Sequence, residues 1–256
     1  MKIKIFSLVA VLAMVFTTIA WAKDKDSKDT SDEVKRVEAA TNVLDEIMGT
    51  KDKGIPDKIM EDAKCLAVVP SMLKAGFVVG GRYGKGVATC RTSRGWSAPA
   101  PFTVAGGDWG LQIGGEAIDL VMVVMNEKGM RNLLNAKFKI GADASASAGP
   151  IGRAASADTD WKLKSEMLTY SRSRGVFAGV TLNGAVVKQD DDETRVLYGK
   201  AVPFADILTG KVAAPAGTEK FLATVRRYSE QAQGERGEVN PPAPTSSSPT
   251  ESADKQ

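Results

Sequence analysis

Glycine set inside apolar, strand-like stretches is the feature that most constrains the fold of this chain. Of the 25 glycines, 18 lie between Lys74 and Gly184, and residues such as Val, Ile, Phe, Leu and Trp stand between them. Flexible linkers instead place polar residues between their glycines. Glycine within an apolar strand is typical of a bend, a bulge or a point where another backbone comes close. The pattern therefore predicts a tightly curved sheet.

The periodicity of the rest of the chain predicts the elements around that sheet. Strands are expected near residues 65–69, 75–82, 86–91, 97–105, 109–115, 117–125, 139–148, 165–173, 175–181 and 184–188. Helices are expected over residues 32–48, 56–64, 127–135, 203–210 and 218–231. Tight connections are expected at 83–86, 93–95, 174–175 and 183–184, the last being an Asn-Gly hairpin signal. The expected fold class is α+β: a single domain with a strongly curved, mainly antiparallel sheet or partial barrel and flanking helices.

The two ends of the chain differ in character from this domain. Lys2 and Lys4 precede an uncharged stretch that closes with Ala20-Trp21-Ala22, which is typical of a secretory signal peptide. We expect cleavage after Ala22 and a periplasmic or secreted product; an uncleaved membrane anchor is the alternative. The expected organisation is a signal peptide over 1–22, a disordered linker over 23–30, a folded domain over 31–232 and a disordered tail over 233–256.

The chain has two cysteines, Cys65 and Cys90, each at the end of an apolar run. In an exported protein the oxidising compartment favours a disulfide between them, and two buried thiols are the alternative. No histidine is present, and two cysteines cannot complete a zinc site. We therefore expect neither a metal nor a cofactor.

The balance of charge argues against a nucleic-acid partner. The formal net charge is +3, and it falls to +1 without residues 1–22, which contain two lysines and no acid. A dedicated nucleic-acid binder has a strong basic excess. A local patch for an anionic surface is still compatible with this balance, and scattered surface charge is the alternative. The candidate lipid-binding residues are Lys35, Arg36, Lys74, Arg82, Lys85, Arg91, Arg172 and Arg174, with Arg94 beside them.

Catalytic equipment is sparse. The absence of histidine removes the Ser–His and Cys–His nucleophile pairs. Ser71 and Lys74 match an SxxK pattern, so a serine hydrolase is one alternative, although the SDN and KTG partners of that pattern are missing. The glycines of 80–86 lack phosphate-loop spacing, and the acidic run 190–193 suits a solvated helix start better than a cation loop. No catalytic residue is proposed.

Four long stretches, residues 70–86, 95–129, 138–153 and 170–187, together resemble the SYLF domain. The resemblance implies lipid binding, since eukaryotic members bind phosphoinositides and actin, partly through an amphipathic N-terminal helix and basic residues. Bacterial members are exported. The helix at 32–48 stands where the lipid-contacting helix of the family would be, so it either packs on the sheet or lies in a lipid interface.

For an exported chain the resemblance implies an anionic phospholipid membrane surface as the partner, with no actin expected in that compartment. The leading interpretation is therefore a non-enzymatic lipid-binding protein of the periplasm. A structural or envelope-stress protein that binds a protein partner is the alternative from another class.

Overall fold

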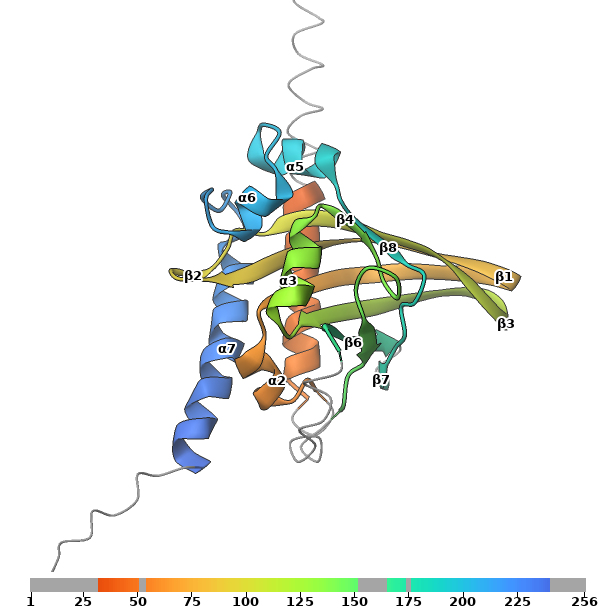
Figure 1. The fold of residues 1–256 in the computed structure, drawn as a ribbon, viewed down its shortest axis with the longest axis horizontal. Coiled ribbons are helices and arrows are strands. Elements are labelled where there is room, and N and C mark those ends of the chain that lie inside the picture. The colour runs from red at the N-terminus through yellow and green to blue at the C-terminus, as the bar shows by residue number, and fades with distance from the viewer. Residues whose placement is uncertain (1–31, 51–53, 152–164, 174–175, 240–256) are drawn as a thin grey trace, which may run out of the picture.

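The computed structural model describes residues 32–50, 54–151, 165–173 and 176–239 (Figure 1). The predicted signal peptide and linker lie outside these ranges, as do Arg174 and the chain beyond residue 239. Within them the predicted α+β class is confirmed, with one strongly curled, mainly antiparallel sheet and helices packed against it.

A single two-stranded ribbon forms most of the sheet. Strands β1 (Cys65–Thr92) and β3 (Ala100–Val124) pair antiparallel from Cys65–Val124 at one end to Ala88–Ala100 at the other. The ribbon runs out to one side of the molecule and folds back on itself (Figure 1), so that the backbone N–H of Arg91 donates to the carbonyl of Lys64 at 2.7 Å. The predicted division of each strand into three pieces was wrong. The turn predicted at 83–86 was also wrong, since these residues continue the strand.

Glycine is required where the two halves of the folded strand β1 come close to each other. A Cβ atom on Gly86 would lie 2.2 Å from the carbonyl oxygen of Val68, and one on Gly84 would lie 2.5 Å from the side chain of Val69. Both distances are too short for any other residue. These glycines therefore allow the close backbone approach that the sequence pattern indicated, and they do so inside a strand and not at a turn.

Two register shifts shape the ribbon. At the bend, Phe77 pairs with Ile113 and Val78 with Gly110, so two residues of β3 have no partner in β1 and β3 takes the longer, outer path. A β-bulge separates Val69 from Met72, and there the Ser71 backbone has a φ of 50°. Both irregularities turn the ribbon back over the body of the protein.

Six short strands complete an eight-stranded sheet. They are β2 (Gly95–Trp96), β4 (Lys137–Lys139), β5 (Ala146–Ala148), β6 (Met167–Ser173), β7 (Val176–Gly179) and β8 (Val186–Gln189). β6 pairs with the end of β3 and with β7, while β8 pairs with the start of β3 and with β4. The parallel contact of β5 with β6 makes the sheet mixed.

The turn predictions had different outcomes. The connection at 93–95 is confirmed: it joins β1 to β2, and Gly95 has a φ of 107°. Gly184 also lies in a turn with a φ of 83°. However, the hairpin predicted around it was wrong, because β7 pairs with β6 and β8 pairs with β3 and β4. The single strand predicted over 139–148 is split between β4 and β5.

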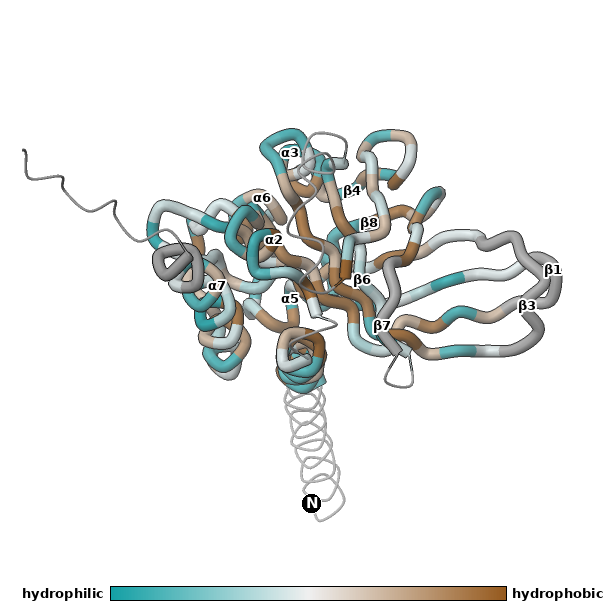
Figure 2. Tube along the Cα trace, turned by 90° about the horizontal axis from the view of Figure 1, so that it is seen from below, coloured by the Kyte–Doolittle hydropathy of each residue, from teal (hydrophilic) through white to brown (hydrophobic). Residues whose placement is uncertain are grey.

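Helices cover both faces of the sheet near the disulfide. They are the N-terminal helix (residues 32–48), α2 (Asp57–Asp62), α3 (Glu127–Leu134), α5 (Asp191–Tyr198), α6 (Phe204–Leu208) and α7 (Glu219–Val239). One core joins the sheet to α3 and α6, and a second joins its other face to the N-terminal helix, α2 and α7. Figure 2 shows hydrophobic segments gathered in the middle of the molecule. Helix α7 continues to Val239, beyond the end expected at residue 231 and into the segment expected to be the tail.

The N-terminal helix packs on the sheet. Val37, Leu44 and Ile47 are buried in the second core, whereas Lys35 and Glu38 are exposed. No helix among the described residues is long and apolar enough to cross a membrane.

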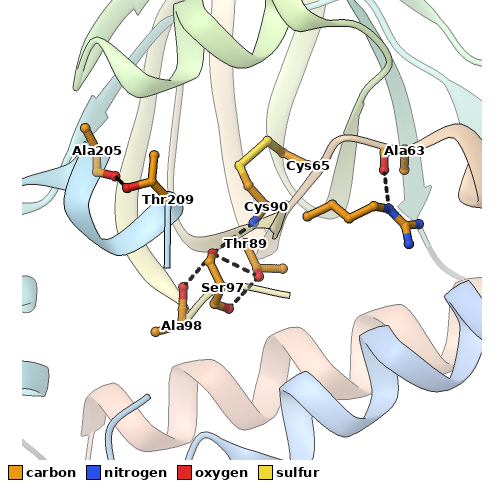
Figure 3. The surroundings of a disulfide bond; sticks show 9 residues. Ala63, Cys65, Thr89, Cys90, Ser97, Ala98, Ala205 and Thr209 are labelled. Carbon is orange, nitrogen blue, oxygen red and sulfur yellow. Dashed lines mark hydrogen bonds between the residues drawn. A yellow bond between two sulfur atoms is a disulfide. The ribbon is translucent and has the colours of Figure 1, made fainter. Parts of the chain in front are cut away.

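The predicted disulfide is confirmed, and it joins the two ends of a single strand. Cys65 and Cys90 lie 25 residues apart in β1, and the fold-back of the ribbon brings their Cα atoms to 4.0 Å (Figure 3). Ser97 supports this region, because its hydroxyl accepts the Cys90 N–H at 3.0 Å and its carbonyl accepts the Thr89 hydroxyl at 2.7 Å. The bond fixes the base of the folded ribbon.

Candidate functional site: a lysine face on the sheet

The structure does not gather the predicted basic residues into one patch. Lys35 is exposed and pairs with Asp32 at 2.9 Å. Arg172 pairs with Asp119 at 2.7 Å and also contacts Glu46. Most of the predicted cations therefore have carboxylate or carbonyl partners inside the fold, and their contact with lipid stays a prediction.

Two of the predicted cations, both in strand β1, are buried or half-buried. Arg82 is 6% exposed and donates to the Thr181 carbonyl at 3.0 Å, whereas Lys74 is half-buried and pairs in register with Glu116. Arg94 is exposed and donates to the Gly210 carbonyl.

Arg91 acts as a structural clamp. Its guanidinium donates to the carbonyls of Glu61 and Ala63 in and after α2, and to the Ser229 hydroxyl of α7, and it lies 4.8 Å from the ring centre of Trp96. Burial lowers the pKa of this guanidinium. The side chain therefore ties two helices to the end of β1.

A buried charge cluster joins the N-terminal helix to β1 and α5. Glu193 accepts from Arg36 at 3.1 Å and from Lys85, and Lys85 also pairs with Asp190 at 3.2 Å. Burial acts to lower the pKa of Lys85, but the two carboxylates outweigh it and raise the pKa. Burial and the neighbouring Glu193 carboxyl raise the pKa of Glu33 to about 7. Arg36 and Lys85 are thus held by acids and cannot meet an anion freely.

The acidic run 190–193 begins helix α5, as the sequence indicated. Asp190 caps the helix by accepting the Glu193 N–H at 3.1 Å. Among the described residues no three His, Cys, Asp or Glu side chains are grouped as metal ligands would be.

An unpredicted set of lysines shares one exposed face of the sheet. Register places Lys137 of β4 opposite Lys188 of β8, then Thr103 of β3 and Lys85 of β1 in the same cross-strand row. The neighbouring row contains Lys139, Val186, Ala105 and Tyr83. We call Lys137, Lys139 and Lys188, with Tyr83 in the adjoining row, the lysine face.

The strand alternation explains why these side chains are exposed. Phe138, Val187 and Val104 point to the opposite face and are buried in the first core. Lys137, Lys139 and Lys188 are therefore directed to solvent, and all three are exposed.

The lysine face has an unfavourable local electrostatic arrangement. Lys137 and Lys188 are like charges in directly opposed positions, which costs about 0.2–1 kcal/mol. In the part of the chain that the structure describes, no carboxylate lies within ion-pair distance of the three lysines. Asp143 is close to Lys139, but one of its carboxylate oxygens accepts the Lys139 backbone N–H at 2.7 Å. An external anion would relieve this repulsion.

Sequence reasoning missed the lysine face because β4 and β8 are about 50 residues apart and meet only through their pairing. The expected hairpin at 183–184 placed Lys188 beside the wrong strand. The usable signal was the alternation in Lys137-Phe138-Lys139, which indicates one buried and two exposed positions.

Comparison with known proteins gives a consistent family assignment. The family model described as "Ysc84: Las17-binding protein actin regulator" matches residues 105–228. Protein YSC84 of Saccharomyces cerevisiae is 36% identical over 177 residues, covering 67% of this chain and 37% of the yeast protein. The chain belongs to the Ysc84/SYLF family. The resemblance seen in the sequence is thereby confirmed.

Animal members of the SYLF family show a similar level of identity. SH3 domain-containing YSC84-like protein 1 of Rattus norvegicus is 32% identical over 191 residues, covering 74% of this chain and 56% of the rat protein. The human protein of the same name is 31% identical over the same length and coverage. This chain thus spans between about a third and just over half of the relatives it matches. The family description is that of an actin regulator and names no enzymatic activity.

Proposed function

We propose that this SYLF-family chain is a non-enzymatic phospholipid-binding protein that acts at an anionic membrane surface in the bacterial periplasm. The observation that supports this most directly is the lysine face, where three exposed lysines without carboxylate partners lie beside the exposed Tyr83. The export signal expected in residues 1–22 supports the periplasmic location.

The shape and chemistry of the lysine face suit an extended anionic surface. It spans the four strands β4, β8, β3 and β1, or about 14 Å at normal strand spacing. Each lysine near an anionic bilayer contributes about 1 kcal/mol, so three contribute about 3 kcal/mol, a factor of about 10² in affinity. Tyrosine beside lysine is also typical of the membrane–water interface. The expected binding is moderate in strength and sensitive to salt.

Vesicle co-sedimentation tests the proposal. We expect the purified protein to sediment with phosphatidylglycerol-containing vesicles at low salt, and not with pure phosphatidylcholine vesicles. Replacement of Lys137, Lys139 and Lys188 by Gln should weaken binding about 10²-fold. The control replaces Lys200, Lys211 and Lys220, which are equally numerous and exposed but belong to the α5–α7 region, where Lys211 pairs with Asp206 and Lys220 with Glu38. Equal loss in both variants, or no binding by the unmodified protein, would refute the proposal.

A protein partner is the second candidate function. The family description names the binding of Las17, a protein, by its members. An envelope protein bound by this chain would be recovered from detergent-solubilised, lipid-depleted extract, whereas the proposed function requires vesicles.

The serine hydrolase alternative gains no support from the structure. Ser71 lies in the β-bulge of β1, where its backbone N–H donates to Asp119 at 3.0 Å. No hydrogen bond joins its hydroxyl to Lys74 among the described residues. Absence of labelling at Ser71 by an active-site serine probe is the expected result.

A further inference from the structure

Two exposed apolar side chains lie on the β1–β3 ribbon, one on each side of its bend. Leu73 is 60% exposed and Tyr83 is 47% exposed, and they are the large hydrophobic side chains with high exposure among the described residues. Single exposed apolar residues are normal on protein surfaces. These two, however, lie on either side of the same bend, at Phe77 and Val78 in β1. Exposed apolar side chains therefore flank the bend on both sides.

The sequence at the bend is apolar as well. Residues 76–79 of β1 read GFVV, and residues 108–114 of β3 read DWGLQIG, with Asp108 as the single charged residue in the two stretches. Figure 1 shows this end of the ribbon standing out from the body. An apolar sequence at a projecting end is unusual unless a partner covers it.

The ribbon end and the lysine face adjoin. Tyr83 shares its cross-strand row with Lys139, and the row of Lys137 and Lys188 lies two residues further from the bend. From the bend toward the body of the protein, the apolar stretches come first, Tyr83 and Lys139 come next, and Lys137 and Lys188 follow. Membrane proteins show the same order from the acyl boundary to the head groups. We infer that the bent end of the β1–β3 ribbon enters the interface of the anionic bilayer to which the lysine face binds, an inference that rests on the proposed function.

Backbone hydrogen bonding limits the depth of entry. Within the described part of the chain, residues 106–118 of β3 pair only with β1, since β8 ends its pairing at Ala105 and β6 begins at Asp119. Among these residues the outer edge of β3 therefore has N–H and C=O groups without a strand partner, and such groups cannot be placed in hydrocarbon. The ribbon end should thus lie in the head-group and upper acyl region, about 5–10 Å deep.

Charge favours a lipid surface over a second copy of the chain as the partner of the ribbon end. The free edge of β3 could in principle pair with the same edge of another molecule. Such pairing would bring two lysine faces close together, and like charges oppose that contact. An anionic bilayer instead complements the lysines while it covers the apolar end.

A fluorescent label at position 73 tests the inference. Both native cysteines are in the disulfide, so Leu73→Cys provides a single reactive thiol for an environment-sensitive dye. With phosphatidylglycerol vesicles we expect the emission to shift to the blue and to be quenched by shallow, but not deep, lipid quenchers. The matched control is Lys220→Cys on α7, whose label should stay in water. In addition, Leu73→Glu should weaken vesicle binding about tenfold with an unchanged melting temperature.

The outcomes separate this inference from the proposed function. If vesicles bind but the label at position 73 stays in water, the inference is overturned while the proposed function stands. If neither variant nor unmodified protein binds vesicles, the proposed function fails as well. A blue shift that rises with protein concentration without vesicles would show self-association and would also overturn the inference.

Discussion

The charge cluster at the start of the N-terminal helix predicts an unusual dependence of stability on pH. Burial first, and then the Glu193 carboxyl, raise the pKa of Glu33 to about 7 from an ordinary 4.5, while Arg36 opposes the shift. Folded protein therefore retains a proton on Glu33 at pH values where the unfolded chain has lost it. The stabilisation from this proton is complete below pH 4.5 and disappears as the pH rises through 7.

The magnitude follows from the same pair of pKa values. The rise of the Glu33 pKa from 4.5 to about 7 corresponds to a stabilisation of the folded state by about 3 kcal/mol. Because Glu33 is only partly buried and solvent screens its interactions, we expect a fall in the free energy of unfolding of about 1–2 kcal/mol between pH 4.5 and 8. Glu33→Gln keeps a neutral side chain at every pH, so it should remove this fall and be more stable than the unmodified protein at pH 8.

Urea unfolding followed by tryptophan fluorescence at pH 4.5, 6 and 8 measures the effect. The chain has no histidine, so few other groups titrate in this window. Glu38→Gln is the control, because Glu38 lies on the exposed side of the same helix. If the stability curves of Glu33→Gln and the unmodified protein run parallel across the three pH values, the reasoning about the Glu33–Glu193 pair is wrong.

Two further predictions concern the folded ribbon. Gly86→Ala should destabilise the protein by more than about 2 kcal/mol in urea unfolding, since its Cβ would meet the Val68 carbonyl at 2.2 Å. Gly107→Ala, where nothing lies within 4 Å, should cost little, and equal costs would contradict the close-approach argument. Replacing both Cys65 and Cys90 by Ser should lower the free energy of unfolding by about 3.5 kcal/mol, the value for a loop of 25 residues. An unchanged denaturation midpoint would exclude a stabilising role for the bond.

Local signals predicted much of this fold. Helical period predicted the N-terminal helix and α3, and the expected export signal favoured the disulfide, since these predictions depend on nearby residues or on compartment. The strand divisions failed for a physical reason: Gly84 and Gly86 resemble a turn in sequence, yet they serve a close backbone approach that depends on residues about 16 positions away. The lysine face could not be predicted from the sequence for a related reason, because only the pairing of β8 with β4 places Lys188 opposite Lys137.

The continuous pairing of β1 with β3 also orders the events of folding. The short connection near Gly95 brings Ala88 and Ala100 together first, and pairing can then extend residue by residue toward Cys65 and Val124. In the folded chain this pairing and the fold-back of the ribbon hold Cys65 beside Cys90. Because these are the two cysteines of the chain, the same bond forms whether it closes before or after pairing is complete. Closed early, it would keep the two ends of β1 together while the rest of the ribbon pairs.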